Sequence, residues 1–352
     1  MVIMHNKKFR VYLFFGILGL ILWAVFALKG ILAPFIIAMI FAYVFNPLIN
    51  FFNNKLKVPR SVSIILVYLI LIVSNVLLVN YFFRSILFEV ESIRENSTQY
   101  AKTLQQSTQM VPDFLRPLIS DYVSALNKNQ IIESFAFSPF PFVTKAFSGI
   151  LGFFIFIFSA FFFLKDGRKM ADGFVSLAPN EYQAKIKMLL KRINVTLSSY
   201  LRGQFIIILS MFVMVYLGLS ILGIKYALTI ALFTAVLEIV PFVGPLAALI
   251  FSAILVIISG GPNYFGLNFI QAALTVILIE YAARLIQDYL IAPIIIGKAV
   301  KIHPLTILFA VIAGEHVYGI LGVLLAVPIA ASIKIIYQFI IENVEGSSKS
   351  SL

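Results

Sequence analysis

Long apolar runs, separated by short polar or glycine- and proline-containing breaks, fill most of this sequence. A helix needs about 20 residues to cross a hydrocarbon core about 30 Å thick. The runs close to that length are residues 11–28, 31–49, 61–83, 142–164, 204–222 and 268–285. The pattern therefore predicts an all-α polytopic membrane protein with about six full spans.

Residues 226–259 hold two further apolar runs, each too short to span, on either side of a break. Glu238 opens this break, and Pro241, Gly244 and Pro245 follow it. Proline cannot donate a backbone hydrogen bond and glycine permits a positive φ, so we predict that the chain turns here. The two runs would then form a re-entrant helical hairpin, which enters and leaves the membrane on the same side.

A similar arrangement returns at residues 304–341, where the polar, glycine-bounded stretch from Gly314 to Gly319 interrupts the apolar pattern. We predict a second broken hairpin here, and the charge pattern makes it enter from the opposite face. Backbone groups freed at a break cannot face lipid. Both tips are therefore expected to be buried in protein or to line a watery cavity, where a transported solute can be held.

Basic residues in the connecting segments predict sidedness, because cytoplasmic loops are enriched in Lys and Arg. Lys7, Lys8 and Arg10 place the N-terminus in the cytoplasm. Residues 84–140 carry nearly balanced charge and are expected outside, as a small subdomain, an interfacial helix pair or a solvated linker. Residues 165–203 are basic, with apolar residues at helical spacing, and are expected along the cytoplasmic headgroups.

These features divide the chain into successive parts. Residues 1–83 contain the first three spans, 84–140 the extracytoplasmic amphipathic segment, 141–164 the fourth span and 165–203 the cytoplasmic basic amphipathic segment. Residues 204–341 form the C-terminal transport core with both hairpins, and the serine-rich tail 342–352 is expected to be disordered.

Composition narrows the function classes. Hydrophobic residues make up 61% of the chain, more apolar surface than a soluble domain could bury. The net charge of +12 is assigned to cytoplasmic loops and anionic headgroups, so membrane lipid is an expected partner and nucleic acid is not. The chain has no cysteine, its 3 histidines are scattered, and it lacks phosphate-loop, zinc-protease and serine-hydrolase motifs. We therefore predict no metal, no catalytic residue, no direct ATP use and no enzyme activity.

The candidate chemistry lies in the last third of the chain. A carboxylate at membrane depth is costly, so Glu238 is a functional candidate; the alternative is a packing kink with Glu238 hydrogen-bonded to a neighbour. Glu280, Arg284 and Asp288 are spaced i, i+4 and i+8, which places them on one helix face, where each acid can pair with the central guanidinium. The cluster keeps one net negative charge, which suits a proton or sodium site, although a static clamp between helices is the competing interpretation.

Several short motifs occur in register with these residues. They are an acid before a Pro-aromatic-aliphatic-Gly-Pro turn (Glu238, Pro241 to Pro245), an acid followed by Pro and Gly (Asp288, Pro293, Gly297), His303-Pro304, Gly319-x-x-Gly322 with a later Pro328, and the stretches Phe161 to Gly167 and Tyr200 to Gln204. Together they resemble the autoinducer-2 exporter family of bacterial and archaeal membrane proteins. The sequence departs from the family at Glu315 and His316, where small or apolar residues are expected after Gly314.

This resemblance implies a secondary transporter in a prokaryotic cytoplasmic membrane. It would export a small polar signal or metabolite, such as autoinducer-2, by alternating access, driven by an ion gradient and as a homo-oligomer. Some members exchange sodium or lithium for protons, so a Na⁺(Li⁺)/H⁺ antiporter is the first alternative. A passive channel is the second, with polar groups available only at the hairpin tips.

The predicted site residues form two sets. For substrate or ion binding they are Glu238, Pro241, Gly244, Pro245, Glu280, Arg284, Gln287, Asp288 and Pro293. In the second hairpin they are His303, Pro304, Gly314, Glu315, Gly319, Gly322 and Pro328. No cofactor is expected beyond a coupling H⁺ or Na⁺, and the transported species would be a small polar solute or a monovalent cation.

Cysteine labelling tests the predicted topology without background thiols, because the native chain has no cysteine. Cysteines at Met110 and Asn263 should react with a membrane-impermeant thiol reagent in intact cells. Cysteines at Lys57, Lys185 and Val300 should react only after the membrane is permeabilised. Labelling at position 185 but not at 110 would invert the topology.

Overall fold

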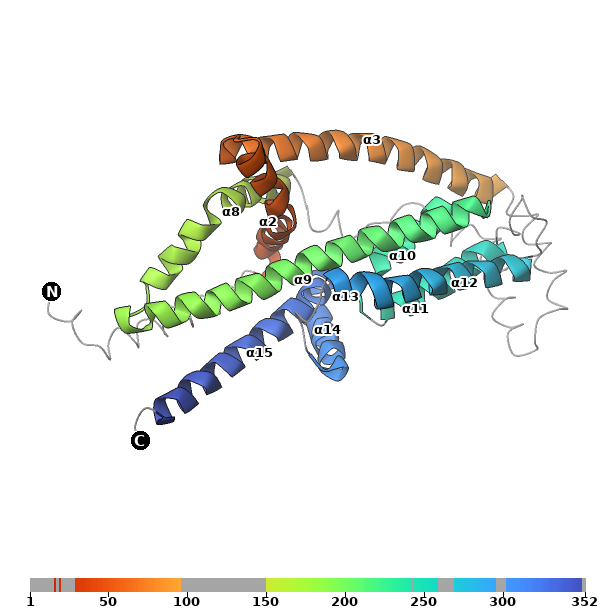
Figure 1. Ribbon diagram of the computed structural model, residues 1–352. Coiled ribbons are helices and arrows are strands. Elements are labelled where there is room, and N and C mark those ends of the chain that lie inside the picture. Colours follow the sequence, from red (N-terminus) through yellow and green to blue (C-terminus); the bar gives the residue numbers. More distant parts are fainter. Residues whose placement is uncertain are drawn as a thin grey trace. The chain divides into compact units, whose positions relative to one another are not determined.

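The computed structural model describes residues 16, 19, 29–95, 150–241, 243–258, 269–295 and 302–349, and its elements in these ranges are helices (Figure 1). They are α2 (Lys29–Lys55), α3 (Arg60–Glu95), α8 (Ile150–Ser176), α9 (Asn180–Ile221), α10 (Ala227–Leu237), α11 (Val243–Ile258), α12 (Phe269–Ile286), the π-helix η3 (Gln287–Ile291), α13 (Ala292–Ile295), α14 (Pro304–Tyr318) and α15 (Ile320–Lys349). Most of the predicted span 11–28 and the segment from residue 96 to 140 lie outside the described residues.

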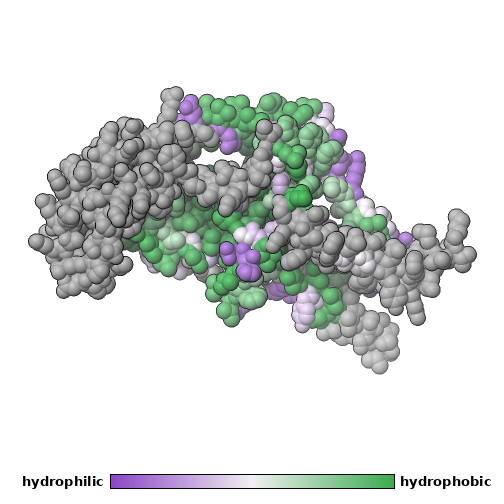
Figure 2. All heavy atoms as spheres, turned by 180° about the vertical axis from the view of Figure 1, so that it is seen from behind, coloured by the Kyte–Doolittle hydropathy of each residue, from purple (hydrophilic) through white to green (hydrophobic). Residues whose placement is uncertain are grey.

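Helices long and apolar enough to cross a membrane are prominent in the described part of the chain. Five qualify, namely Ile31–Lys55, Arg60–Leu78, Asn180–Ile221, Ile270–Ile295 and Ile320–Glu342. Their surface is apolar where a soluble protein would be polar, and hydrophobic side chains cover much of the described surface in Figure 2. Leu77 is 66% exposed and Ile221 77%, as suits residues that face lipid. The prediction of an all-α polytopic membrane protein is confirmed.

The chain forms two compact units, each assembled from separate stretches of sequence. The first unit comprises Met1–Ile70, Phe142–Gly203 and Ile296–Leu352, and the second comprises Leu71–Pro141 and Gln204–Ile295. The first hairpin and the charged helix after it therefore belong to the second unit, whereas the second hairpin belongs to the first.

A polar cluster joins three helices of the first unit at one end of α3. The Nε of Arg60 donates to the carbonyl of Leu164 in α8 at 2.7 Å. Its two terminal nitrogens donate to the side-chain oxygens of Asn46 and Asn50, one turn apart on α2, at 2.8 and 3.0 Å. Each polar group thereby gains a partner, which an apolar environment requires.

The second predicted hairpin consists of α14 and α15, but its break differs from the prediction. The stretch from Gly314 to Tyr318 is helical, so the prediction of a polar, glycine-bounded tip is wrong there. The chain turns at Gly319 alone, with φ at +60°, and the Gly319 amide donates to the Glu315 carbonyl at 2.7 Å. A glycine with left-handed φ ends a helix in this way, and Glu315 and His316 fit into the last helical turn before it.

Gly314 and Gly322 let the two helices of this hairpin meet backbone to backbone. A Cβ built on Gly322 would lie 1.8 Å from the Gly314 carbonyl oxygen. A Cβ on Gly314 would lie 2.4 Å from the Gly322 oxygen. The two glycines are thus explained by close packing, which any side chain would prevent.

The start of α14 is capped, and α15 continues past a proline towards the C-terminus. His303 caps α14, because its Nδ1 accepts from the Leu305 amide at 3.2 Å, and Pro304 occupies the first turn, where its missing N–H is not needed. α15 runs through Pro328 to Lys349. Near its C-terminal end, Glu342 pairs with Arg192 of α9 at 2.8 Å.

In the second unit, α10 and α11 fold back on one another and form the first hairpin. The rings of Phe233 and Phe251, one from each helix, stack with centroids 4.0 Å apart. Buried apolar side chains join this pair to α9 and α12; they are Met211, Val215, Leu219, Ile224, Ala227, Ile230, Ala231, Val256, Ala272, Val276 and Ala283. The helix-break-helix pattern predicted from the sequence is present at this position.

Gly244 holds the tip of this hairpin by close contact. Its φ is not positive, since the glycines with positive φ among the described residues are Gly223 and Gly319. The chain therefore does not use at Gly244 the positive φ that glycine permits. A Cβ on Gly244 would instead lie 1.8 Å from the carbonyl oxygen of Leu237, the last residue of α10. Glycine is required because the start of α11 packs directly on the end of α10.

Gly244→Ala should therefore destabilise the protein as well as slow transport. Overpacking costs about 1–3 kcal/mol, and here the obstructing atoms belong to the backbone and cannot rotate away. The measurement is thermal unfolding of the purified protein in detergent. Gly167→Ala is the matched control, because a Cβ there meets no atom of the described residues within 4 Å. Equal melting temperatures for the two variants would contradict the close contact.

Candidate functional site

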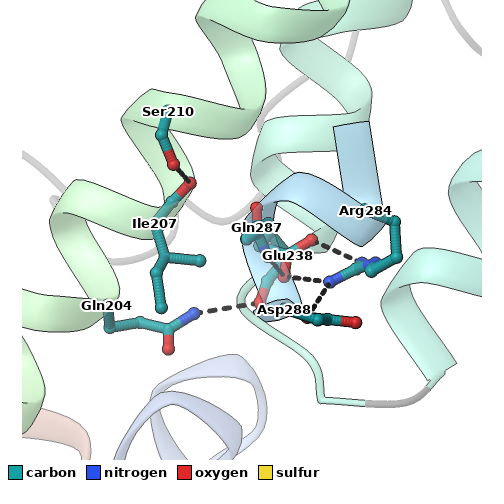
Figure 3. Close-up of polar contacts among 7 residues, drawn as sticks. All are labelled: Gln204, Ile207, Ser210, Glu238, Arg284, Gln287 and Asp288. Carbon is teal, nitrogen blue, oxygen red and sulfur yellow. Dashed lines mark hydrogen bonds and ion pairs between the residues drawn. The ribbon is translucent and has the colours of Figure 1, made fainter. Parts of the chain in front are cut away.

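The carboxylate of Glu238 lies at the end of α10, where the chain leaves the helix, and Glu238 is only 8% exposed. Both of its oxygens accept from the guanidinium of Arg284, with Nη1 to Oε1 at 2.7 Å and Nη2 to Oε2 at 2.8 Å. The amide nitrogen of Gln287 donates to the same Oε1 at 2.8 Å. Figure 3 shows these side chains converging. A two-pronged arginine contact of this kind is strong and fixes orientation as well as charge.

The tip is also held from α9. The side-chain amide of Gln204 donates to the backbone carbonyl of Glu238 at 3.1 Å (Figure 3). This carbonyl belongs to the broken end of α10, where intrahelical partners run out. Sequence reasoning did not select Gln204 as a site residue, although its place in the motif from Tyr200 to Gln204 was the available signal.

A π-helical turn shapes the other side of the site. In η3 the Ala292 amide donates to the carbonyl of Gln287, five residues back. Pro293 explains this widening, because its ring would clash in an α-helix with the carbonyl of Tyr289, four residues before it. Such turns often mark functional sites. Pro293 therefore contributes by setting the backbone that carries Gln287 and Asp288.

Asp288 is bound more loosely than Glu238. Its Oδ1 lies 3.9 Å from Nη1 of Arg284, and its side chain is 54% exposed. Glu238 and Asp288 together contribute two negative charges against the single positive charge of Arg284, so the ionised cluster keeps one net negative charge. The prediction that Asp288 shares a helix face with Arg284 agrees with this contact, but Glu238 is the main partner of Arg284.

Glu280 is not part of this ion-pair cluster. The prediction that it pairs with Arg284 is wrong, because Oε1 of Glu280 instead lies within hydrogen-bond distance of two hydroxyls, that of Thr234 at 2.9 Å and that of Ser252 at 2.5 Å. All three residues are buried. The i, i+4 spacing places two residues on one helix face, but Arg284 reaches beyond that face to Glu238 at the hairpin tip. Ser252 was missed, since an isolated serine in an apolar run gives no signal of its own.

The remaining predicted residues have structural roles. Pro241 lies in the turn between α10 and α11, and Pro245 lies in the first turn of α11, where proline is tolerated. The second-hairpin residues, His303 to Pro328, belong to the other compact unit, where they cap, break and pack α14 and α15. Within the described residues, no three His, Asp or Glu side chains are grouped so that they could hold a metal ion.

Comparison with known proteins places this architecture in a family. The profile described as AI-2E family transporter matches residues 12–342. The chain belongs to this family. The resemblance found in the motifs is confirmed, and together with the apolar spans it makes the chain a multi-pass membrane transport protein.

Individual relatives agree with this assignment along most of their length. The chain is 28% identical to the "Putative transport protein YueF" of Bacillus subtilis over 330 residues, which cover 91% of this chain and 86% of the relative. It is 23% identical to the "Putative transport protein YrrI" of the same organism, with 92% and 91% covered. A protein of Halobacillus andaensis named "Sodium-lithium/proton antiporter" is 21% identical, with 91% and 92% covered.

The geometry predicts unequal effects within the charge cluster. Arg284→Ala should lower the free energy of unfolding by about 3–5 kcal/mol, because it leaves the buried Glu238 carboxylate without its cation. Asp288→Asn should change it by less than about 1 kcal/mol, because this side chain is exposed and its ion pair is long. Denaturant unfolding of the two purified variants measures both quantities. Similar losses for the two would contradict the assignment of Glu238 as the main partner.

Proposed function

We propose that this transporter is a secondary exporter of a small polar solute with the chemistry of autoinducer-2. An H⁺ or Na⁺ gradient drives it, and access to the site alternates between the two sides of a prokaryotic cytoplasmic membrane. Its N-terminus is cytoplasmic and it works as a homo-oligomer. The sequence lacks a phosphate-binding loop, which favours an ion gradient over ATP as the energy source.

The observation that carries this proposal is an unsatisfied acceptor beside the Glu238 ion pair. Gln287 is 2% exposed, and its side-chain oxygen has no hydrogen-bond partner among the residues that the structure describes. A buried acceptor left without a donor costs about 1–3 kcal/mol, so a ligand that supplies a hydroxyl or a positive charge is stabilised there. The half-exposed carboxylate of Asp288, the next residue, adds a second acceptor on the open side.

The same cluster links ligand binding to movement of the hairpin. Glu238 lies at the break between α10 and α11, and its partners Arg284 and Gln287 lie on α12 and η3. A solute or cation that competes for the carboxylate weakens the contacts that hold the tip against α12. Broken helices around a membrane site are used in this way in secondary transporters, where one element moves and the remainder of the bundle stays fixed.

A second candidate function is a Na⁺(Li⁺)/H⁺ antiporter. The net negative charge of the ionised cluster attracts a small cation without any organic solute. The antiporter of Halobacillus andaensis, to which the chain is 21% identical, supports this alternative. In this case the cation is the transported species, and Asp288 and Gln287 would be its ligands.

Transport into liposomes separates the candidates. The purified full-length protein is reconstituted with a pH-sensitive dye inside, and autoinducer-2, sodium or lithium is added outside. The proton-driven exporter predicts proton movement on adding autoinducer-2, and the sodium-driven exporter predicts uptake of autoinducer-2 that depends on a sodium gradient. Either response should be lost in Glu238→Gln and kept in Glu342→Gln, a matched acid-to-amide change at the exposed Arg192 pair. Proton movement with sodium or lithium alone would favour the antiporter. Solute flux without any linked ion movement would contradict both and indicate a channel.

A further inference from the structure

A second carboxylate, separate from the Glu238 cluster, is enclosed between three helices of the second unit. Glu280 of α12 is 2% exposed, Thr234 of α10 is 1% exposed and Ser252 of α11 is fully buried. Both hydroxyls contact Oε1 of Glu280, at 2.9 Å from Thr234 and 2.5 Å from Ser252. Val276 and Ala283, on the same side of α12, belong to the buried apolar cluster. The site is thus a small polar island inside an apolar core.

Ser252 has two hydrogen-bond contacts but one hydroxyl hydrogen, and this indicates which group carries the proton in its contact with Glu280. Its Oγ is 2.8 Å from the carbonyl oxygen of Ala248 and 2.5 Å from Oε1 of Glu280. Both separations are those of full hydrogen bonds, but a serine hydroxyl has one hydrogen to donate. When Ser252 donates to Ala248, the hydrogen in the short contact must come from the carboxyl group. Each of the three hydrogen bonds has a donor hydrogen when Glu280 is protonated and donates to Ser252, while Thr234 donates to Glu280.

The charges around the site favour the same state. Neither α10 nor α11 contains a titratable side chain, and the titratable group of α9 between residues 204 and 221 is the phenol of Tyr216, whose ring stacks on Phe212. The nearby cation, Arg284, is bound through two nitrogens to Glu238. An ionised Glu280 would therefore be a buried charge without a counter-ion, which is costly. Protonation of Glu280 neutralises this charge and removes the cost without any counter-ion.

We propose that Glu280, with Ser252 and Thr234, is a proton-binding site of this transporter. In the loaded state the proton is on the carboxyl group and Ser252 donates to Ala248. In the empty state the proton has left to water, and the Ser252 hydroxyl turns from the Ala248 carbonyl to donate to the carboxylate. Each state satisfies every hydroxyl hydrogen at the site, so the two hydroxyls accommodate either form of the acid by rotation alone.

The role of this proton in coupling rests on the proposed function. The three residues come from both arms of the first hairpin and from α12, the same elements that meet at the Glu238 ion pair. An empty, charged Glu280 is tolerated only when water reaches it, which requires α10 and α11 to move from α12. Loss of the proton and opening of the hairpin would thereby be linked.

Infrared spectroscopy of the full-length protein in lipid tests the proton site directly. At neutral pH the wild type should show the carbonyl absorption of a buried protonated carboxyl group, and Glu280→Gln should lose it. Ser252→Ala should keep the band but shift its frequency, because the carboxyl hydrogen loses its acceptor. Ser210→Ala is the matched control, since that hydroxyl also donates to a carbonyl of its own helix, that of Ile207 at 2.8 Å, and contacts no acid among the described residues (Figure 3). A band unchanged in Glu280→Gln would overturn the proposal, and so would one that Ser252→Ala does not shift.

A transport measurement then tests coupling separately. Glu280→Gln imitates the protonated acid, so it should still exchange autoinducer-2 across liposomes that contain the solute on both sides. It should lose accumulation driven by a pH gradient. Retention of that accumulation would remove Glu280 from coupling. Failure of the wild type to move autoinducer-2 at all would count against the proposed function, while the infrared result on the proton site would stand.

Discussion

The carboxylate of Glu238 lies where the chain leaves α10 and is shielded from solvent, so its charge has to be compensated within the protein. Arg284 supplies that compensation through two hydrogen bonds, and Gln287 adds a third. These contacts require α12 to lie against the hairpin tip and require the π-helical turn that presents Gln287. The position of the tip against α12 and the separation of Glu280 from the ion pair both follow from this one interaction.

In each broken hairpin the two helices must be held together where the chain turns, and the two hairpins use different contacts to do this. In the first, the end of α10 is closed by the Glu238 side-chain contacts and by the contact of Gly244 with the Leu237 carbonyl. In the second, one glycine with positive φ turns the chain, and Gly314 and Gly322 pack the helices at backbone distance. The first tip is therefore held by polar side-chain contacts for which a ligand can compete. The second is held by close packing between the backbones of Gly314 and Gly322.

Much of the fold follows from local sequence. Run lengths and breaks predicted the spans at 31–49, 61–83, 204–222 and 268–285 and the presence of two broken hairpins, because proline, glycine and the thickness of a membrane act on a few residues at a time. The pairing of charges did not follow, since Arg284 finds its partner 46 residues earlier in the chain. Spacing on one helix suggested Glu280 instead, and nothing in the sequence marks Ser252 as its neighbour. The reason for Gly244 was also out of reach, because a close approach between backbones leaves no local signal.

A double-mutant cycle on Glu238 and Arg284 tests the central claim most directly. The free energy of unfolding is measured for the wild type, Glu238→Gln, Arg284→Met and the double variant. If the ion pair fixes the tip, each single change leaves a buried group without its partner and the double change removes both. The double variant should then lose less than the sum of the single losses, with a coupling of about 1–3 kcal/mol. Losses that simply add would show that the two residues act independently and would contradict this account.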